Sequence, residues 1–248
     1  CPADVARGLG ALGERFISGQ QPSLEAQLAN IADEIAYNNH DVDDGLRAGL
    51  LDLPSLAKDV ELVGQFAQAV REEHTDLSDR RLIYEIIRRM IGALVNDLVD
   101  TSRARLAEAK PQTLDDVRRL KTPMIGFSDT MRSRVMTLKR YLMEHLYQHP
   151  RVREMTEQAQ RVVRALFDHY HDAARSDLTG GVPPNLPVMR IRRTPAAEDR
   201  EALAARAVAD YVAGMTDRFA LAEYDQLIAA STSARRDRRG ALEAPAQP

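Results

Sequence analysis

One long run of apolar residues at helical spacing constrains this fold more than any other feature. Between Asp79 and Ala109 the segment LIYEIIRRMIGALVNDLV has an apolar side chain at nearly every third or fourth position, and often between them. That period is typical of an α-helix, and a helix that is apolar around most of its circumference packs against neighbours on several sides. We therefore expect residues 79–109 to form the central helix, with Gly92 marking a close helix crossing.

The rest of the chain has the same helical period and no strand signal. No alternation of apolar and polar residues continues for more than four positions. Aromatic residues make up 5% of the chain and tryptophan is absent, so the core must rest on Leu, Ile, Val, Ala and Met, a set that favours helices. The sequence predicts an all-α fold, with helices over residues 22–45, 54–71, 79–109, 129–147, 151–174, 197–213 and 216–229.

Length and punctuation suggest three regions. A chain of 248 residues can form one large domain or two small ones. Residues 1–21 contain four glycines and little periodicity, so we expect an irregular lead-in there. Residues 22–230 are expected to be all-helical, interrupted most clearly by the loop SDLTGGVPPNLP at 176–187. The tail 231–248, with RRDRR followed by APAQP, is expected to be disordered.

The first predicted long helix carries an unusual acidic face. Asp33, Tyr37 and Asp41 stand at i, i+4 and i+8, so they follow one another along a single stripe, and Asp44 lies close beside it. Residues 25–44 contain six acids and no Lys or Arg. A divalent metal or a basic side chain from elsewhere could neutralise this charge. The alternative is an ordinary solvated helix face, with the tyrosine used for packing.

Three stretches together resemble one enzyme family. SLEAQLANIADEIAYNNHDVDDGLRAGLL at 23–51, YLMEHLYQHPRV at 141–152 and ADYVAGMTDRFAL at 209–221 look like segments of the bacterial deoxyguanosinetriphosphate triphosphohydrolase family, in the same order. The resemblance covers roughly two hundred residues. It implies a multi-helix bundle of the HD-domain type and hydrolysis of dGTP or other dNTPs to the deoxynucleoside and inorganic triphosphate.

The resemblance also assigns residues on the acidic face. It makes Asp33 a ligand of a divalent metal such as Mg²⁺ or Mn²⁺, and Tyr37 and Asp41 contacts to the deoxynucleotide substrate. Helix geometry agrees with this division, because Asp41 lies about 12 Å along the axis from Asp33, whereas a metal–oxygen bond is about 2 Å. One metal ion therefore cannot bind both carboxylates.

Other parts of the family's metal site have no counterpart in these residues. The family takes a histidine and a His-Asp pair from earlier helices, the pair lying in a stretch resembling HDLGHTPFGH. The dipeptides His40-Asp41 and His171-Asp172 lack the glycine and histidine that follow in that pattern. Because the chain opens at Cys1 without this half of the site, we expect a fragment that is inactive alone.

Cations for a polyphosphate are harder to place. Arg132, Arg134, Lys139 and Arg140 lie on one predicted helix just before the second matched stretch, and arginine can bind phosphate oxygens in bidentate fashion. They are weaker candidates, since they could equally form a solvated basic face or pair with the acids of the first helix. His145 and His149 have a metal-compatible spacing, but without a third ligand we interpret them as structural.

Composition limits the compartment and the partners. A single cysteine cannot form an internal disulfide, no apolar run approaches the twenty residues of a membrane span, and no signal peptide is evident, so we expect a cytoplasmic protein without a membrane partner. The family resemblance implies a homo-oligomer. Nucleic acid binding by the basic tail is the weakest partner hypothesis. The alternative to an enzyme is a non-catalytic nucleotide-sensing or oligomer-scaffold module.

Overall fold

A computed structural model describes residues 3–74, 76–175 and 197–227, and every regular element in them is helical. The all-α prediction is therefore confirmed. The chain divides into two compact units, residues 1–149 and 150–248, a division that the prediction of one region over 22–230 did not anticipate. The predicted loop at 176–187 and tail at 231–248 lie outside the described residues. None of the described helices is long and apolar enough to cross a membrane.

The predicted irregular lead-in is wrong over residues 3–17. This segment forms two short helices, α1 (Ala3–Gly8) and α2 (Ala11–Ile17), which pack on each other. Gly10 has φ 58° in the turn between them. An added Cβ on Gly13 would lie 1.6 Å from the carbonyl oxygen of Ala6, so only glycine allows this approach. The glycines that suggested irregularity instead let two helices meet.

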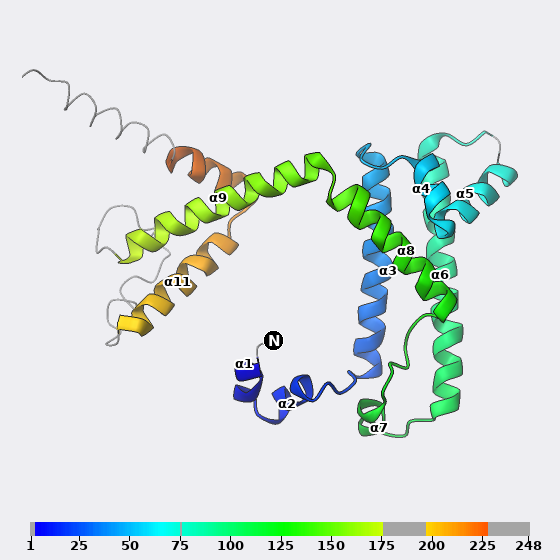
Figure 1. Cartoon of the computed structure of the whole chain (residues 1–248), viewed down its shortest axis with the longest axis horizontal. Helices are drawn as coiled ribbons and strands as arrows, with labels where there is room; N and C mark the ends of the chain where they lie inside the picture. The colour runs from blue at the N-terminus through cyan, green and yellow to red at the C-terminus, as the bar shows by residue number, and fades with distance from the viewer. Residues whose placement is uncertain (1–2, 75, 176–196, 228–248) are drawn as a thin grey trace, which may run out of the picture. The chain divides into compact units, whose positions relative to one another are not determined.

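Two long antiparallel helices form the framework of the first unit. α3 (Leu24–Arg47) and α6 (Asp79–Ala109) lie side by side, as Figure 1 shows. Ser23 caps the beginning of α3, since its hydroxyl accepts the Ala26 backbone N–H. Residues four apart along α6 are buried against neighbouring helices and make up much of the core: Leu82, Ile86, Met90, Leu94 and Leu98.

The expectation that α6 packs against neighbours on several sides is only partly met. Ile91, Val95 and Val99, on the side away from the buried stripe, remain about 40% exposed to solvent. The predicted close crossing at Gly92 is absent among the described residues, because an added Cβ there would meet no atom within 4 Å. The apolar pattern correctly predicts a helix, but not the number of helices that cover it.

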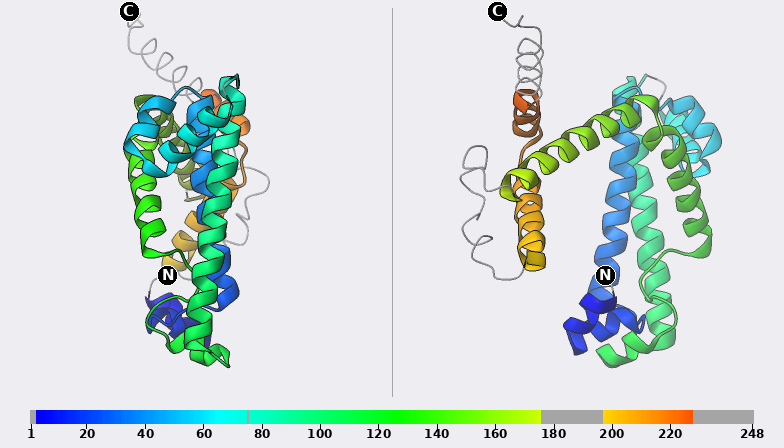
Figure 2. Two further views of the ribbon diagram at one scale, coloured as in Figure 1. Left: turned by 90° about the vertical axis from the view of Figure 1, so that its right-hand side faces the viewer. Right: turned by 60° about the vertical axis from the view of Figure 1, so that its left-hand side comes forward.

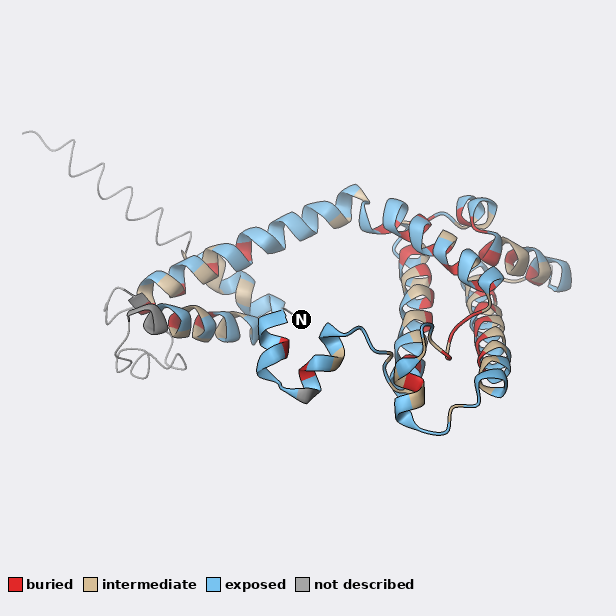
Figure 3. Cartoon of the chain, turned by 60° about the horizontal axis from the view of Figure 1, so that its bottom comes forward, coloured by how far each residue is buried: buried red, intermediate tan, exposed pale blue. Residues whose placement is uncertain are grey.

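Shorter helices cover the long pair. Residues predicted as one helix over 54–71 form two, α4 (Leu53–Asp59) and α5 (Glu61–Glu73), because Val60 between them has extended φ and ψ. α7 (Leu114–Arg119) begins with a capping box formed by Thr113 and Asp116. α8 (Asp129–Leu142) packs against α3 and α5 and continues into a π-helical turn, η1 (Met143–Tyr147); Figure 2 shows these elements from two further sides. Buried residues follow the inward sides of these helices (Figure 3).

Side chains of the long helices hold the connection between α7 and α8. The Oε1 atom of buried Gln27 accepts the backbone N–H groups of Met124 and Ile125 at 2.8 and 3.1 Å. Asp97 accepts both the N–H and the hydroxyl of Ser128, at 2.9 and 2.6 Å. Because buried backbone groups need partners, these bonds fix the path of a segment without regular structure of its own.

The second unit is built on α9 (Pro150–Arg175), α11 (Ala197–Ala213) and helical residues 217–227. Tyr170 of α9 lies at its centre: its ring meets that of Tyr211 edge-on, with centroids 5.3 Å apart, and its hydroxyl donates to Glu223. The buried core around it consists of Val162, Leu166, Tyr170, Ala174, Ala204 and Val208.

Candidate functional site

The acidic stripe lies on the side of α3 that faces away from the core. Asp33 and Tyr37 are exposed, Tyr37 by 64%, and Asp41 is half-buried. Ile35 and Val42, on the other side of the same helix, are buried in the core. The helix therefore presents a carboxylate, a phenol ring and a second carboxylate in sequence on one accessible face, with about 6 Å of axial rise between neighbours.

Asp41 has a partner that the sequence analysis did not identify. The hydroxyl of Tyr147, in η1, donates a hydrogen bond to Oδ2 of Asp41. Partial burial, together with this bond, raises the pKa of Tyr147 to about 12, so the phenol stays protonated and acts as a donor. Tyr147 thus fixes the orientation of a carboxylate assigned to the substrate.

Two local features bring Tyr147 to Asp41. Gly45 is buried within α3, where an added Cβ would lie 2.6 Å from Leu51 and 3.2 Å from Leu146. Its missing side chain lets η1 approach the helix. The π-helical turn then shifts the side-chain direction at the end of α8, as π-turns near functional sites often do. Tyr147 lies inside the stretch YLMEHLYQHPRV that resembles the family. That resemblance was the one feature of the sequence that could have pointed to Tyr147 as a site residue.

The basic candidates have two different environments. Arg134 pairs with Glu61 of α5 at 2.7 Å, and Lys139 pairs with Glu34 of α3 at 3.1 Å. The alternative of pairing with the first helix's acids is therefore realised for Lys139. Arg132 and Arg140 are exposed, and no described carboxylate lies within 4 Å of either. These two remain available for phosphate oxygens.

A complete metal site is not present in the described part of the chain. No three described His, Cys, Asp or Glu side chains gather closely enough to bind one ion. Asp33 supplies a single carboxylate, so the described residues do not by themselves fit the metal that the family resemblance implies. The ring of His145 lies against that of Tyr141, with centroids 4.2 Å apart and planes tilted by 37°, which suits its structural interpretation.

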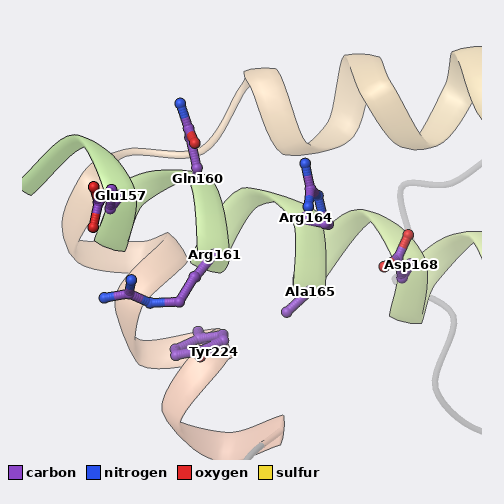
Figure 4. Close-up of a pocket in the computed structure, with 7 residues that line it drawn as sticks. All are labelled: Glu157, Gln160, Arg161, Arg164, Ala165, Asp168 and Tyr224. Atoms are coloured by element: carbon purple, nitrogen blue, oxygen red, sulfur yellow. The ribbon is translucent and has the colours of Figure 1, made fainter.

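A shallow cavity of about 460 Å³ lies in the second unit (Figure 4). It runs along α9 beside Tyr224, and its charged lining consists of Glu157, Arg161, Arg164 and Asp168. Two arginines against two carboxylates leave no net charge to attract a polyphosphate. We therefore assign no part of the substrate to this cavity.

Comparison with known proteins defines the class. Residues 125–226 match the phosphohydrolase-associated domain family, a match that includes α8, η1, α9 and α11. The described residues are therefore helical, and residues 125–226 are similar to a phosphohydrolase-associated domain.

Curated proteins similar to this chain are described as deoxyguanosinetriphosphate triphosphohydrolase-like. This chain is 47% identical to the one from Bordetella pertussis over 227 residues, 44% identical to the one from Thiobacillus denitrificans over 230 residues, and 43% identical to the one from Ralstonia pickettii over 229 residues. Each match covers 92% of this chain and 55 or 56% of the relative. Over most of its own length the chain is similar to these triphosphohydrolase-like proteins, and it spans about half the length of the curated relatives that it matches.

Proposed function

We propose that the complete gene product hydrolyses deoxynucleoside triphosphates to the deoxynucleoside and inorganic triphosphate. The observation that carries this proposal is the accessible face of α3, where Asp33, Tyr37 and Asp41 lie in sequence and Tyr147 bonds to Asp41. An exposed tyrosine ring between two carboxylates suits a sugar lying along the helix. The relatives' description as triphosphohydrolase-like supports the same reaction class.

The substrate contacts follow from the chemistry of each side chain. The Tyr37 ring can lie against the apolar side of the deoxyribose, and the Asp41 carboxylate can accept a hydrogen bond from a sugar hydroxyl. Tyr147 satisfies one oxygen of Asp41 and leaves the other free for the substrate. The uncommitted guanidinium groups of Arg132 and Arg140 are our candidates for the phosphate oxygens.

Asp33 is proposed as one carboxylate ligand of a divalent metal. A bound divalent cation would supply positive charge for a phosphate oxygen and a water of lowered pKa. The remaining ligands would have to come from outside the described residues, which offer no group of three suitable side chains. Homo-oligomerisation and a cytoplasmic location are likewise proposals.

The direct test is product analysis on the complete gene product. Each dNTP is incubated with Mn²⁺ or Mg²⁺, and inorganic triphosphate and deoxynucleoside are quantified separately from pyrophosphate and monophosphate. Equal amounts of triphosphate and deoxynucleoside are expected. Binding of dNTPs without any hydrolysis would contradict the proposal and favour the nucleotide-sensing or scaffold alternative.

A further inference from the structure

A cavity of about 550 Å³ opens beside the beginning of α3 in the first unit. It is lined by the end of α2, the linker over residues 18–23, the first turn of α3, and Arg118 of α7. Its volume is in the range of small-molecule sites. Ser23, at its edge, lies about 15 Å along the axis of α3 from Asp33, so a ligand here would be at the opposite end of the helix from Asp41.

The lining is positively charged without a compensating acid. Arg15 and Arg118 are its two charged residues. Arg118 pairs with Asp115 at 3.2 Å, but that carboxylate is outside the lining and 65% exposed. The Nε of Arg15 reaches only the Leu12 carbonyl at 3.5 Å, the limit of a hydrogen bond. Both guanidinium groups therefore have donors available for an anion.

An aromatic ring lines the same cavity as these charges. Phe16 lines the cavity and is 68% exposed, although burying an aromatic side chain is strongly favourable. Hydrogen bonds fix the linker beside it: the Gln21 backbone N–H donates to the Arg118 carbonyl at 3.1 Å, and Gln21 Nε2 donates to the Lys121 carbonyl at 3.3 Å. Gly19, at φ 65°, supplies the turn. Two cations and a ring are thus held in one concave site.

We propose that this cavity binds a nucleoside phosphate, with Arg15 and Arg118 on the phosphate oxygens and Phe16 stacked against the base. Guanidinium groups bind phosphates in bidentate fashion, and a base of any identity can stack on an aromatic ring. The proposal goes beyond the hydrolysis proposed above, since it needs neither a metal nor the acidic face of α3.

The test is calorimetric titration of the 248-residue chain with dGMP, deoxyguanosine and pyrophosphate in metal-free, low-salt buffer. Arg15→Gln and Arg118→Gln should each weaken dGMP binding at least about tenfold. Phe16→Leu should weaken the binding of dGMP and leave the binding of pyrophosphate unchanged. Arg47→Gln is the matched control, because it removes an exposed arginine that pairs with Asp43 at 2.9 Å across i,i+4 spacing.

The outcomes separate the possibilities. Binding of dGMP without metal should persist whether or not the complete protein hydrolyses dNTPs, because no residue of this lining belongs to the acidic face of α3. Equal affinity for pyrophosphate and dGMP, with no effect of Phe16→Leu, would reduce the site to a simple anion site and overturn the proposal. An absence of dGMP binding would also overturn the proposal, as would equal losses of dGMP affinity in Arg118→Gln and Arg47→Gln. Circular dichroism of each variant identifies losses caused by misfolding.

Discussion

The bond from Tyr147 to Asp41 joins two stretches of chain that are more than a hundred residues apart. The helical period of the sequence does not predict that these two side chains meet. Tyr147 is 43% exposed, so its hydroxyl could donate to water instead. Its donation to Asp41 supports a role in holding that carboxylate for the substrate.

Tyr147 also makes stability depend on pH. Its pKa is about 12 in the folded chain against an ordinary 10.0, so the folded state keeps a proton that the unfolded state loses between these values. The stabilisation is complete below pH 10 and is lost as pH rises through about 12. At pH 8, urea unfolding should show that the free energy of unfolding of Tyr147→Phe is lower than that of the wild type by about 1 kcal/mol or less, since the hydrogen bond is partly exposed.

The difference in stability between wild type and Tyr147→Phe should then narrow between pH 8 and pH 11. Exposed Tyr84→Phe serves as the control and should differ little from wild type at either pH. A difference that stays constant or widens at alkaline pH would contradict the assigned bond.

Residue identities predicted part of the site. Asp33, Tyr37 and Asp41 could be placed on one helix face because helical spacing alone determines it. Their substrate and metal roles remain proposals. The partner of Asp41 could not be predicted, since it depends on a π-turn and on a glycine packed against Leu146, and neither has a periodic sequence signal.

At the scale of elements, two glycines in the long helices have opposite roles. Gly45 is buried against Leu51 and Leu146, whereas Gly92 faces open space. The sequence predicts a close helix crossing at Gly92, where the structure shows none within the described residues, and it assigns no packing role to Gly45. Sequence cannot distinguish such glycines, because the difference lies in what the neighbouring elements place beside them.

The same substitution should therefore act in opposite directions. Gly92→Ala should stabilise the chain by about 1 kcal/mol through helix propensity. Gly45→Ala should destabilise it by about 1–2 kcal/mol, since the cost of overpacking a buried site exceeds the stabilisation from the higher helix propensity of alanine. Urea unfolding followed by circular dichroism measures both. Equal signs for the two variants would show that the packing of α3 against η1 has been misassigned.

The connection between α7 and α8 depends on Gln27. Gln27→Ala leaves the N–H groups of Met124 and Ile125 without an acceptor inside the protein, and the expected loss of stability is about 2–4 kcal/mol. Gln68→Ala is the control, because exposed Gln68 bonds only to Glu72 within α5. Similar unfolding midpoints for the two variants would argue against this anchoring role.

Helix existence was predicted well and helix boundaries less well. α6 begins and ends at the predicted residues, because its apolar period is long and its ends are marked. The break between α4 and α5 was missed, since Val60 has no turn signature and its extended conformation reflects packing. α1 and α2 were missed because a short helix leaves too few residues for a period to emerge.

At the scale of the whole molecule, the residues that the structure describes hold only part of the proposed chemistry. The described residues contain one proposed metal ligand and no group of three suitable side chains. We expect this chain alone, with Mn²⁺ and each dNTP, to release no triphosphate above a protein-free control. Substantial release by these residues alone would overturn the assignment of Asp33 as one ligand of a larger site.

The measurement that tests the central claim most directly is triphosphate release and metal content in Asp33→Asn of the complete gene product. Asp44→Asn, an exposed acid on the same helix, is the matched control. We predict that Asp33→Asn stays folded, loses bound Mn²⁺, and loses at least about a hundredfold in rate, whereas Asp44→Asn keeps both. Retention of metal and activity in Asp33→Asn would contradict the assignment of the α3 face to the metal and the nucleotide.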